Sequence, residues 1–228
     1  MAPPLVKVCC IASIDEAGRA VAAGAAVLGL VTAMPSGPGV ISDAQAADIA
    51  AHVRRNASAV QTFLLTSRTT AASIAEQHAA IGSTALQLVD HVPEVELQQL
   101  RRWCAGVQLV QVVHVTGPAS VDEAQAAAPW VDALLLDSGN PQAAVKELGG
   151  TGRTHDWALS RRIRDAVWPL PLFLAGGLNA GNVAAAVAAV RPHGLDLCSS
   201  VRSAGALDDT KLHAFFDAVK RAPTSEPT

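Results

Sequence analysis

The chain has 228 residues, of which 50% are hydrophobic and 16% are charged. This composition can fill a large core, and the length approaches the roughly 250 residues usual for a (β/α)8 barrel. The formal net charge of -3 disfavours general nucleic-acid binding, which favours a basic stripe. No apolar run approaches the roughly 18 residues that a membrane span needs, and the start MAPPLVKVCC does not indicate a signal peptide.

The four cysteines show no pattern of a metal site or of a disulfide framework. Cys9 and Cys10 are adjacent, Cys104 and Cys198 stand alone, and no CxxC pair of the zinc type occurs. Cys104 falls late in a helical stretch, where we expect a small core residue. We therefore expect a cytoplasmic protein in a reducing setting, a monomer or homodimer, with no metal, nucleic-acid or membrane partner.

Short apolar, β-branched runs alternate with alanine-rich helical stretches from end to end. The expected strands are Val6–Ala12, Ala26–Thr32, Ala59–Thr66, Thr84–Val89, Val107–Val115, Val131–Asp137, Leu170–Ala175 and Gly194–Ser199. Ser13 followed by Glu16 predicts a capping box that opens a helix over Ile14–Ala23, and Ser42 and Ser120 mark two further helix starts.

Eight strands that are apolar on both faces, each followed by a helix, predict a parallel sheet covered by helices. Eight such units close into a barrel more naturally than they form an open sheet. No linker composition interrupts the chain, so the expected fold is α/β, a single-domain (β/α)8 TIM barrel over residues 1–222. The polar residues 223–228 form an expected disordered tail.

In this fold the chemistry lies at the C-terminal ends of the strands. The candidate functional residues at such ends are Cys9, Asp137, Gly176, Gly177, Ser199 and Ser200. Three histidines, His52, His78 and His213, fall inside helical patterns, and we expect them on the surface.

Cys9 has two interpretations. It is either a buried structural thiol, as free cysteines often are, or an acid–base thiol whose pKa falls near helix N-termini and a phosphosugar's binding groups. Alternation along the strand separates it from its neighbour. If Cys9 points into the barrel, Cys10 is expected to face the helices and to be structural.

Asp137 ends the run Leu134–Leu136. It would cap a following helix, but no helical pattern begins directly after it. A carboxyl group at a strand end over a partly desolvated pocket has a raised pKa, which suits a general acid. We therefore expect Asp137 to be functional.

Glycine-rich turns and a serine pair follow the last three strands. Gly149–Gly152 follows the sixth strand, Gly176 and Gly177 the seventh, and Ser199 and Ser200 the eighth. Glycine lets backbone N–H groups approach phosphate oxygens, and loops after strands seven and eight form the phosphate site of many such barrels. A phosphorylated small molecule is the expected ligand.

These motifs resemble the phosphoribosylanthranilate isomerase family over about residues 6–221. The segment 7–11, KVCCI, resembles the family's opening K-I-C-G-I, which implies that Cys9 is the general base, and Leu135–Asp137 resembles the strand that carries the general acid. Gly149–Trp157, GGTGRTHDW, is close to GGTGKTFDW, and Leu174–Val183, LAGGLNAGNV, matches LAGGLNPENV, which binds phosphate in the family. A looser match joins 194–201, GLDLCSSV, to GVDVSSGV.

The resemblance implies catalytic residues Cys9 and Asp137, an Amadori rearrangement that uses no metal or organic cofactor, and a phosphosugar substrate. The implied substrate-binding residues are Gly149, Gly150, Arg153, Gly176, Gly177, Asn179, Ser199 and Ser200. Such an enzyme is an aldose–ketose isomerase, an intramolecular oxidoreductase, of tryptophan biosynthesis.

The chain departs from the family pattern on the side of the aglycone, the amine substituent of the sugar. Gly39 stands where the family has the arginine that holds the anthranilate carboxylate, and Cys10 stands where it has a glycine. Arg153 and Arg202 are the cations that would replace that arginine. Two alternatives remain open: an isomerase of the same fold for another phosphorylated aminosugar, and a non-catalytic barrel that binds a phosphorylated ligand.

Overall fold

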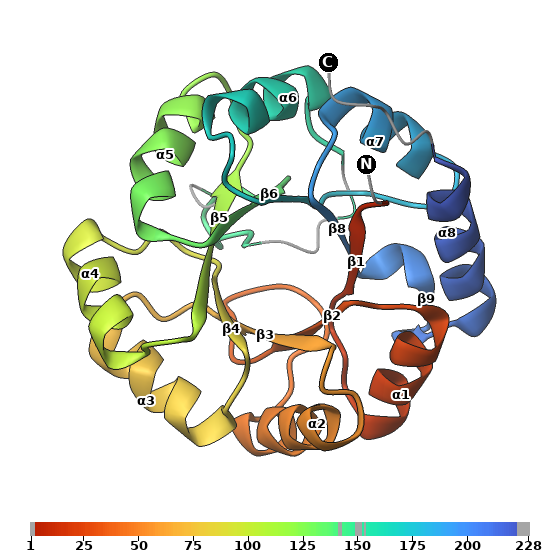
Figure 1. The fold of residues 1–228 in the computed structure, drawn as a ribbon, viewed down its shortest axis with the longest axis horizontal. Helices are drawn as coiled ribbons and strands as arrows, with labels where there is room; N and C mark the ends of the chain where they lie inside the picture. The colour runs from red at the N-terminus through yellow and green to blue at the C-terminus, as the bar shows by residue number, and fades with distance from the viewer. Residues whose placement is uncertain (1–2, 141–142, 149–151, 153, 223–228) are drawn as a thin grey trace.

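The computed structural model describes residues 3–140, 143–148, 152 and 154–222. In this part of the chain, eight parallel strands close into a barrel in sequence order, and the eighth pairs with the first. Figure 1 looks down the barrel and shows the helices as a ring around the strands. The predicted (β/α)8 fold is confirmed.

Every predicted strand run overlaps one strand of the barrel, and β1 begins one residue before its predicted run. The strands are β1 (Leu5–Val8), β2 (Val27–Val31), β3 (Gln61–Thr66), β4 (Ala85–Leu88), β5 (Gln108–His114), β6 (Ala133–Asp137), β7 (Leu172–Leu174) and β8 (Gly194–Leu197). The first is shorter than the predicted run because the backbone turns at Cys10, whose φ is 63°.

The helices begin close to the predicted caps. They are α1 (Ile14–Ala23), α2 (Asp43–Asn56), α3 (Ala71–Ile81), α4 (Glu94–Trp103), α5 (Ser120–Ala127), α6 (Trp157–Ala166), α7 (Val183–Val190) and α8 (Asp209–Arg221). Ser42 forms a full capping box with Gln45. At α1 only half of the predicted box forms: Ser13 accepts from the N–H of Glu16, whose carboxylate is bound elsewhere.

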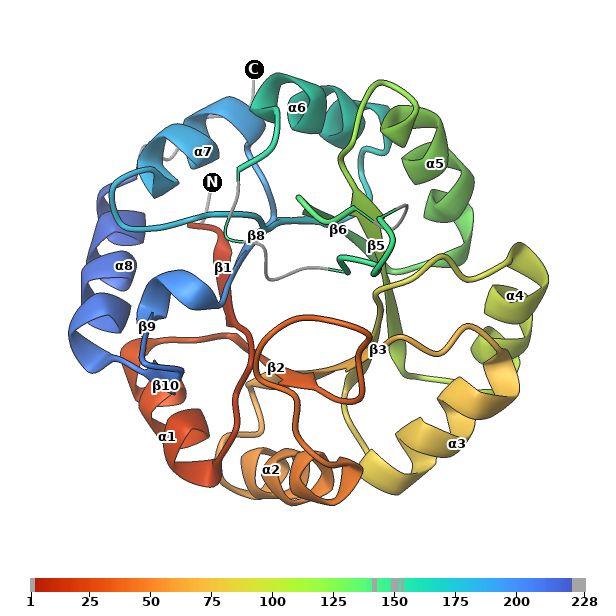
Figure 2. The same ribbon diagram turned by 180° about the vertical axis from the view of Figure 1, so that it is seen from behind.

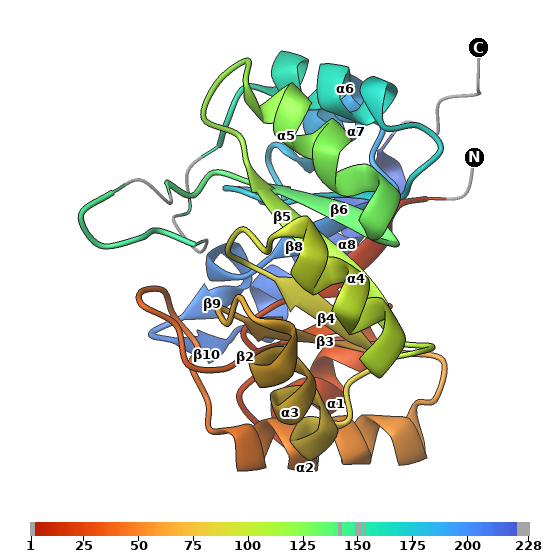
Figure 3. The ribbon, with the colours of Figure 1, turned by 90° about the vertical axis from the view of Figure 1, so that its left-hand side faces the viewer.

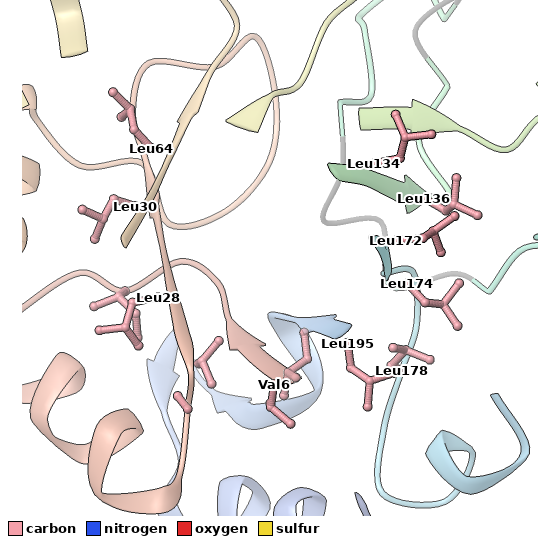
Figure 4. Packing of buried hydrophobic residues seen from close by; sticks show 14 of the residues in the cluster. Val6, Leu28, Leu30, Leu64, Leu134, Leu136, Leu172, Leu174, Leu178 and Leu195 are labelled. Carbon is pink, nitrogen blue, oxygen red and sulfur yellow. The ribbon is translucent and has the colours of Figure 1, made fainter. Parts of the chain in front are cut away.

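Alternation along the strands builds two apolar layers. Outward-facing leucines such as Leu28, Leu134 and Leu172 pack under the helices, and Figure 4 shows them pointing away from the barrel centre. Inward-facing residues such as Phe63 and Phe173 fill the barrel, with ring centroids 5.7 Å apart. No helix in the described ranges is long and apolar enough to cross a membrane.

Cys104 and His213 lie where predicted, and two other histidines are less exposed than predicted. Cys104 is buried at the end of α4. His213 is exposed on α8, whereas His52 and His78 are half-buried on their helices. The predicted tail, residues 223–228, lies outside the described residues.

The C-terminal ends of the strands form one face of the barrel. Figure 3 shows the β2–α2 loop and the hairpin of β9 (Arg202–Ser203) and β10 (Ala206–Leu207) at this end, and Figure 2 looks onto it. The Ser36 hydroxyl donates to the carbonyl of Lys146 at 2.6 Å. This bond ties the β2–α2 loop to the segment after β6, so both loops frame the same mouth.

Candidate active site

A pocket opens at the C-terminal end of the barrel. Six of the predicted functional residues line it: Cys9, Asp137, Gly176, Gly177, Ser199 and Ser200. They come from β1, β6, β7 and β8 or from the residues just beyond these strands. The residues that were predicted as acid, base and phosphate loops from their positions at strand ends therefore line one cavity.

Cys9 continues β1 and is buried in the pocket wall, where its N–H donates to the carbonyl of Leu197 at 2.8 Å. Its side chain lies over Gly29 of β2. A Cβ added to Gly29 would stand 2.8 Å from the Cys9 Sγ and 3.1 Å from the Lys7 Nζ. Because both atoms are so close to a single point, the thiol and the ammonium lie within the roughly 4–6 Å over which opposite charges favour ionisation.

Lys7 is fully buried below Cys9 and forms a 2.8 Å ion pair with Asp196 of β8. Burial would lower the pKa of Lys7, but Asp196 and the neighbouring thiols raise it well above its usual range, so the ammonium stays charged. Burial raises the pKa of Asp196, and Lys7 opposes this rise. The floor of the pocket thus carries a fixed positive charge beside Cys9.

The pKa of the Cys9 thiol is lowered in this environment. Contact with the Cys10 thiol lowers it most, burial opposes, and the Lys7 ammonium lowers it further. A thiol whose pKa is lowered supplies more thiolate, which is the form that acts as a base. These contacts therefore support the interpretation of Cys9 as an acid–base thiol.

Cys10 does not face the helices, and that prediction was wrong. Its φ of 63° breaks the alternation of the strand and turns the side chain toward the pocket, which it lines. The Cys10 thiol donates to the carbonyl of Pro38 at 3.6 Å. Contacts with the thiols of Cys198 and Cys9, together with burial, raise the pKa of Cys10, so it stays a neutral thiol.

Asp137 is the last residue of β6 and is 9% exposed. Its Oδ1 accepts from the N–H of Ser138 at 2.7 Å, so the carboxylate caps its own turn rather than a helix. His114 stands beside it in the register of β5 and β6. The side chain reaches the pocket from the strand that lies across the barrel from β2.

The phosphate side of the pocket consists of two tight turns. Gly176 and Gly177 have φ values of 82° and 61°, which only glycine adopts without strain. Ser199 and Ser200 form the first turn of a 3-10 helix over Ser199–Val201. The Ser200 hydroxyl is buried and makes no hydrogen bond with the described residues, so it is available to an oxyanion.

The remaining predicted binding residues divide into two groups. Asn179 does not line the pocket; its side chain bonds the carbonyl of Gly177 at 3.2 Å and the N–H of Gly181 at 2.9 Å, which holds the turn. Gly149, Gly150 and Arg153 lie outside the described residues.

Arg202 lies outside the pocket. Its guanidinium binds Glu16 of α1 at 3.0 Å and 3.1 Å and donates to the carbonyl of Cys10. It is therefore committed to fixing the β1–α1 turn and does not replace a substrate-binding arginine.

Three residues of the site escaped the sequence analysis. Asp196 lines the pocket and is paired with Lys7, which is buried beneath the lining. Gln87 of β4 lines the pocket wall, and its Oε1 is buried and unpartnered among the described residues. Each shares the inward face of its strand with a recognised or pocket-lining residue two positions away. The two-residue spacing from Cys9 is the sequence signal that could have identified Lys7.

Comparison with known proteins agrees with this geometry. The model of the family N-(5'-phosphoribosyl)anthranilate (PRA) isomerase matches residues 6–218. The chain belongs to this family. It is therefore an aldose–ketose isomerase of tryptophan biosynthesis, which confirms the predicted resemblance and enzyme class.

Curated relatives and a solved structure match over nearly their whole length. The N-(5'-phosphoribosyl)anthranilate isomerase of Synechococcus sp. (strain JA-2-3B'a(2-13)) is 34% identical, covering 97% of this chain and 95% of the relative. That of Desulforudis audaxviator is 36% identical, covering 96% and 98%. The crystal structure of phosphoribosyl anthranilate isomerase from Thermotoga maritima matches with a TM-score of 0.79 at 26% identity, covering 95% and 98%.

Proposed function

We propose that this isomerase acts on N-(5'-phosphoribosyl)anthranilate and converts it by an Amadori rearrangement to the 1-deoxyribulose 5-phosphate product. The observation that carries the proposal is the meeting of Cys9, Asp137 and the phosphate turns in one pocket. An acid and a base on different strands, with a separate anchor for the phosphate, are what this reaction requires.

The phosphate group binds at the turns after β7 and β8. Its oxygens accept hydrogen bonds from the backbone N–H groups of Gly176 and Gly177 and from the Ser200 hydroxyl. The positive φ of both glycines and the unpartnered, buried hydroxyl of Ser200 support this assignment. Binding at this end uses a part of the substrate that does not react, and it holds the furanose ring between Cys9 and Asp137.

Ring opening is the role of Asp137. Its carboxylic acid donates a proton to the furanose ring oxygen, the bond from that oxygen to C1′ breaks, and the nitrogen lone pair forms the C1′ iminium. Its placement at the pocket edge on β6, with Oδ1 held by the Ser138 N–H, fixes the carboxyl group for this transfer.

Proton abstraction is the role of Cys9. The thiolate takes the proton from C2′, and the electrons of that bond move to the iminium and give an enolamine. The enolamine then gains a proton at C1′ and loses one from the C2′ hydroxyl, which yields the ketose. The iminium is the electron sink, and the Lys7 charge beside Cys9 favours the thiolate that starts the step.

Retention of both groups argues against a barrel that only binds a phosphorylated ligand, because binding requires neither an acid nor a base. The cytoplasmic location and the monomeric or homodimeric state stay predictions.

The direct test follows the loss of fluorescence of N-(5'-phosphoribosyl)anthranilate on addition of the protein. We expect turnover by the wild type and a decrease in kcat of about 100-fold or more in Cys9→Ser and in Asp137→Asn. Asp122→Asn, on an exposed position of α5, is the matched control. Turnover by Cys9→Ser near the wild-type rate would exclude Cys9 as the base.

A further inference from the structure

Cys10 adopts a backbone conformation that residues other than glycine rarely take. Its φ is 63°, in the left-handed region, and its side chain is buried in the pocket wall. Such strain persists only where the surrounding structure imposes it, and it concentrates at functional sites. This conformation turns the thiol toward the pocket rather than toward the helices.

The side chain of Cys10 fits only because residue 39 has none. A Cβ added to Gly39 would stand 2.4 Å from the Cβ of Cys10 and 3.0 Å from its Sγ. Gly39 has a φ of 76°, and the preceding carbonyl of Pro38 accepts from the thiol at 3.6 Å. The two residues are therefore complementary: Cys10 fills the space into which any side chain at position 39 would grow.

Apart from Asp137 and Asp196, the wall of the pocket that Cys10 lines is largely apolar. It is completed by Val31, Met34, Leu65, Val89 and Leu148. Among the described residues that line the pocket there is no lysine, arginine or histidine.

Three cations close to the pocket, among the residues that the structure describes, are bound to acids. Lys7 is paired with Asp196 and Arg202 with Glu16, while Lys146 contacts the Asp90 carboxylate at 2.5 Å. The carboxyl groups that line the cavity are those of Asp137 and Asp196. Of the described residues, those that a carboxylate beside Cys10 would meet are a thiol and hydrocarbon side chains.

We propose that Cys10, seated over Gly39, makes this pocket accept N-(5'-phosphoribosyl)arylamines whose ring carries no carboxylate about as well as the anthranilate compound. The inference rests on the proposed function and deepens it by naming the substrate class. Cys10 and Gly39 determine the specificity together, because the Cys10 side chain fills the space that a cationic side chain at position 39 would need. Recognition then comes from the phosphate turns and from apolar contact with the ring, rather than from an ion pair with the ring carboxylate.

The test compares the affinities of two unreactive sugar-alcohol analogues, 1-(phenylamino)-1-deoxyribitol 5-phosphate and its ortho-carboxylated counterpart, by calorimetry. In the wild type we expect dissociation constants that differ by less than about fivefold. In Cys10→Gly/Gly39→Arg, where glycine frees the space for a guanidinium, a charge-assisted bond should favour the carboxylated analogue by roughly tenfold or more. Cys10→Gly alone is the matched control and should leave the ratio unchanged.

A second measurement needs no variant. A carboxylate that is held by a cation loses affinity as salt screens the ion pair. We propose no such ion pair in the wild type, so its ratio of dissociation constants for the two analogues should stay constant between low and high ionic strength. A wild-type preference of fivefold or more for the carboxylated analogue would overturn the proposal. A small ratio that the folded double variant does not raise would overturn the assignment to Cys10 and Gly39.

The two levels of inference fail differently. Loss of turnover of both arylamine substrates, with the affinity ratio near one, would contradict the proposed reaction and leave the selectivity of the pocket as stated. Normal turnover together with a strong dependence of affinity on the carboxylate would support the proposed reaction and contradict the proposed selectivity.

Discussion

The ammonium of Lys7 and the carboxylate of Asp196 lie 2.8 Å apart on the pocket floor, directly below the Cys9 thiol. Each member of a buried ion pair loses its hydration, and the pair often adds little to stability. Here its position suggests another use, because it holds a positive charge beside the group that acts as a base. Gly29 leaves the room that both side chains need.

Lys7→Met is expected to raise the pKa of Cys9 toward that of an ordinary buried thiol. Less thiolate then exists at neutral pH, so the rise of kcat/KM with pH should move upward by roughly one unit or more. The rate of alkylation of Cys9 by iodoacetamide, measured against pH, reports the same ionisation without turnover.

Two further variants make this result interpretable. In Lys7→Met the Asp196 carboxylate is left without its partner, and the double variant Lys7→Met/Asp196→Asn removes this carboxylate as well. A rise in the pKa of Cys9 that occurs in both variants is therefore caused by the loss of the Lys7 positive charge. Lys220→Met, whose ammonium is exposed on α8, is the control. An alkylation profile that is identical in all four proteins would show that Lys7 has no effect on Cys9.

Much of the site could be predicted because it follows from regular structure. Cys9, Asp137 and the glycine turns were recognisable as strand ends, and barrel closure brings strand ends to one face. The inward turn of Cys10 was not predictable from alternation, because its φ is coupled to Gly39, a residue from another loop. The role of Arg202 likewise depends on a contact with Glu16 made across the fold.

Ser200→Ala is expected to weaken the binding of inorganic phosphate. The buried hydroxyl has no partner among the described residues, and a hydrogen bond to a charged group contributes about 1.5–3 kcal/mol. The inhibition constant of phosphate, competitive with the substrate, should therefore rise by roughly tenfold or more. Ser58→Ala, on an exposed turn, should leave it unchanged. Non-competitive inhibition would place the anion elsewhere.

Glu16→Gln is expected to lower the free energy of unfolding at neutral pH by roughly 2–4 kcal/mol, because it leaves Arg202 without its partner. Burial alone would raise the pKa of Glu16. Hydrogen bonds from Arg202 and from the N–H groups of Ala12 and Leu207 outweigh it, so the pKa is lowered.

The sign of the pH dependence follows from that lowered pKa. The stabilisation is fully present above the pKa of an unfolded glutamate and is lost as the pH falls through the folded value. Urea unfolding at pH 7 and at pH 4 should thus show a smaller difference between wild type and Glu16→Gln at the lower pH. Asp15→Asn removes an exposed carboxylate that pairs with Arg19 and serves as the control. A difference that grows on acidification would contradict the assigned pair.

Gly39→Arg alone is expected to destabilise the fold, although sequence reasoning would favour it as a restored carboxylate anchor. The new Cβ would stand 2.4 Å from that of Cys10, and the φ of 76° is unfavourable for arginine. Gly106→Arg separates the cost of the steric clash from the cost of the unfavourable φ. Gly106 has a φ of 84°, but no atom lies within 4 Å of an added Cβ. We expect Gly39→Arg to cost about 1–3 kcal/mol more than Gly106→Arg, in the range typical of overpacking.

Adding Cys10→Gly should recover most of that extra cost, since it removes the clashing side chain and supplies a residue suited to a φ of 63°. A double-mutant cycle by urea unfolding then gives a coupling energy of roughly 1–3 kcal/mol between positions 10 and 39. Additive effects would mean that the loop carrying Gly39 moves aside, and that the side chain of Cys10 does not control what position 39 can carry.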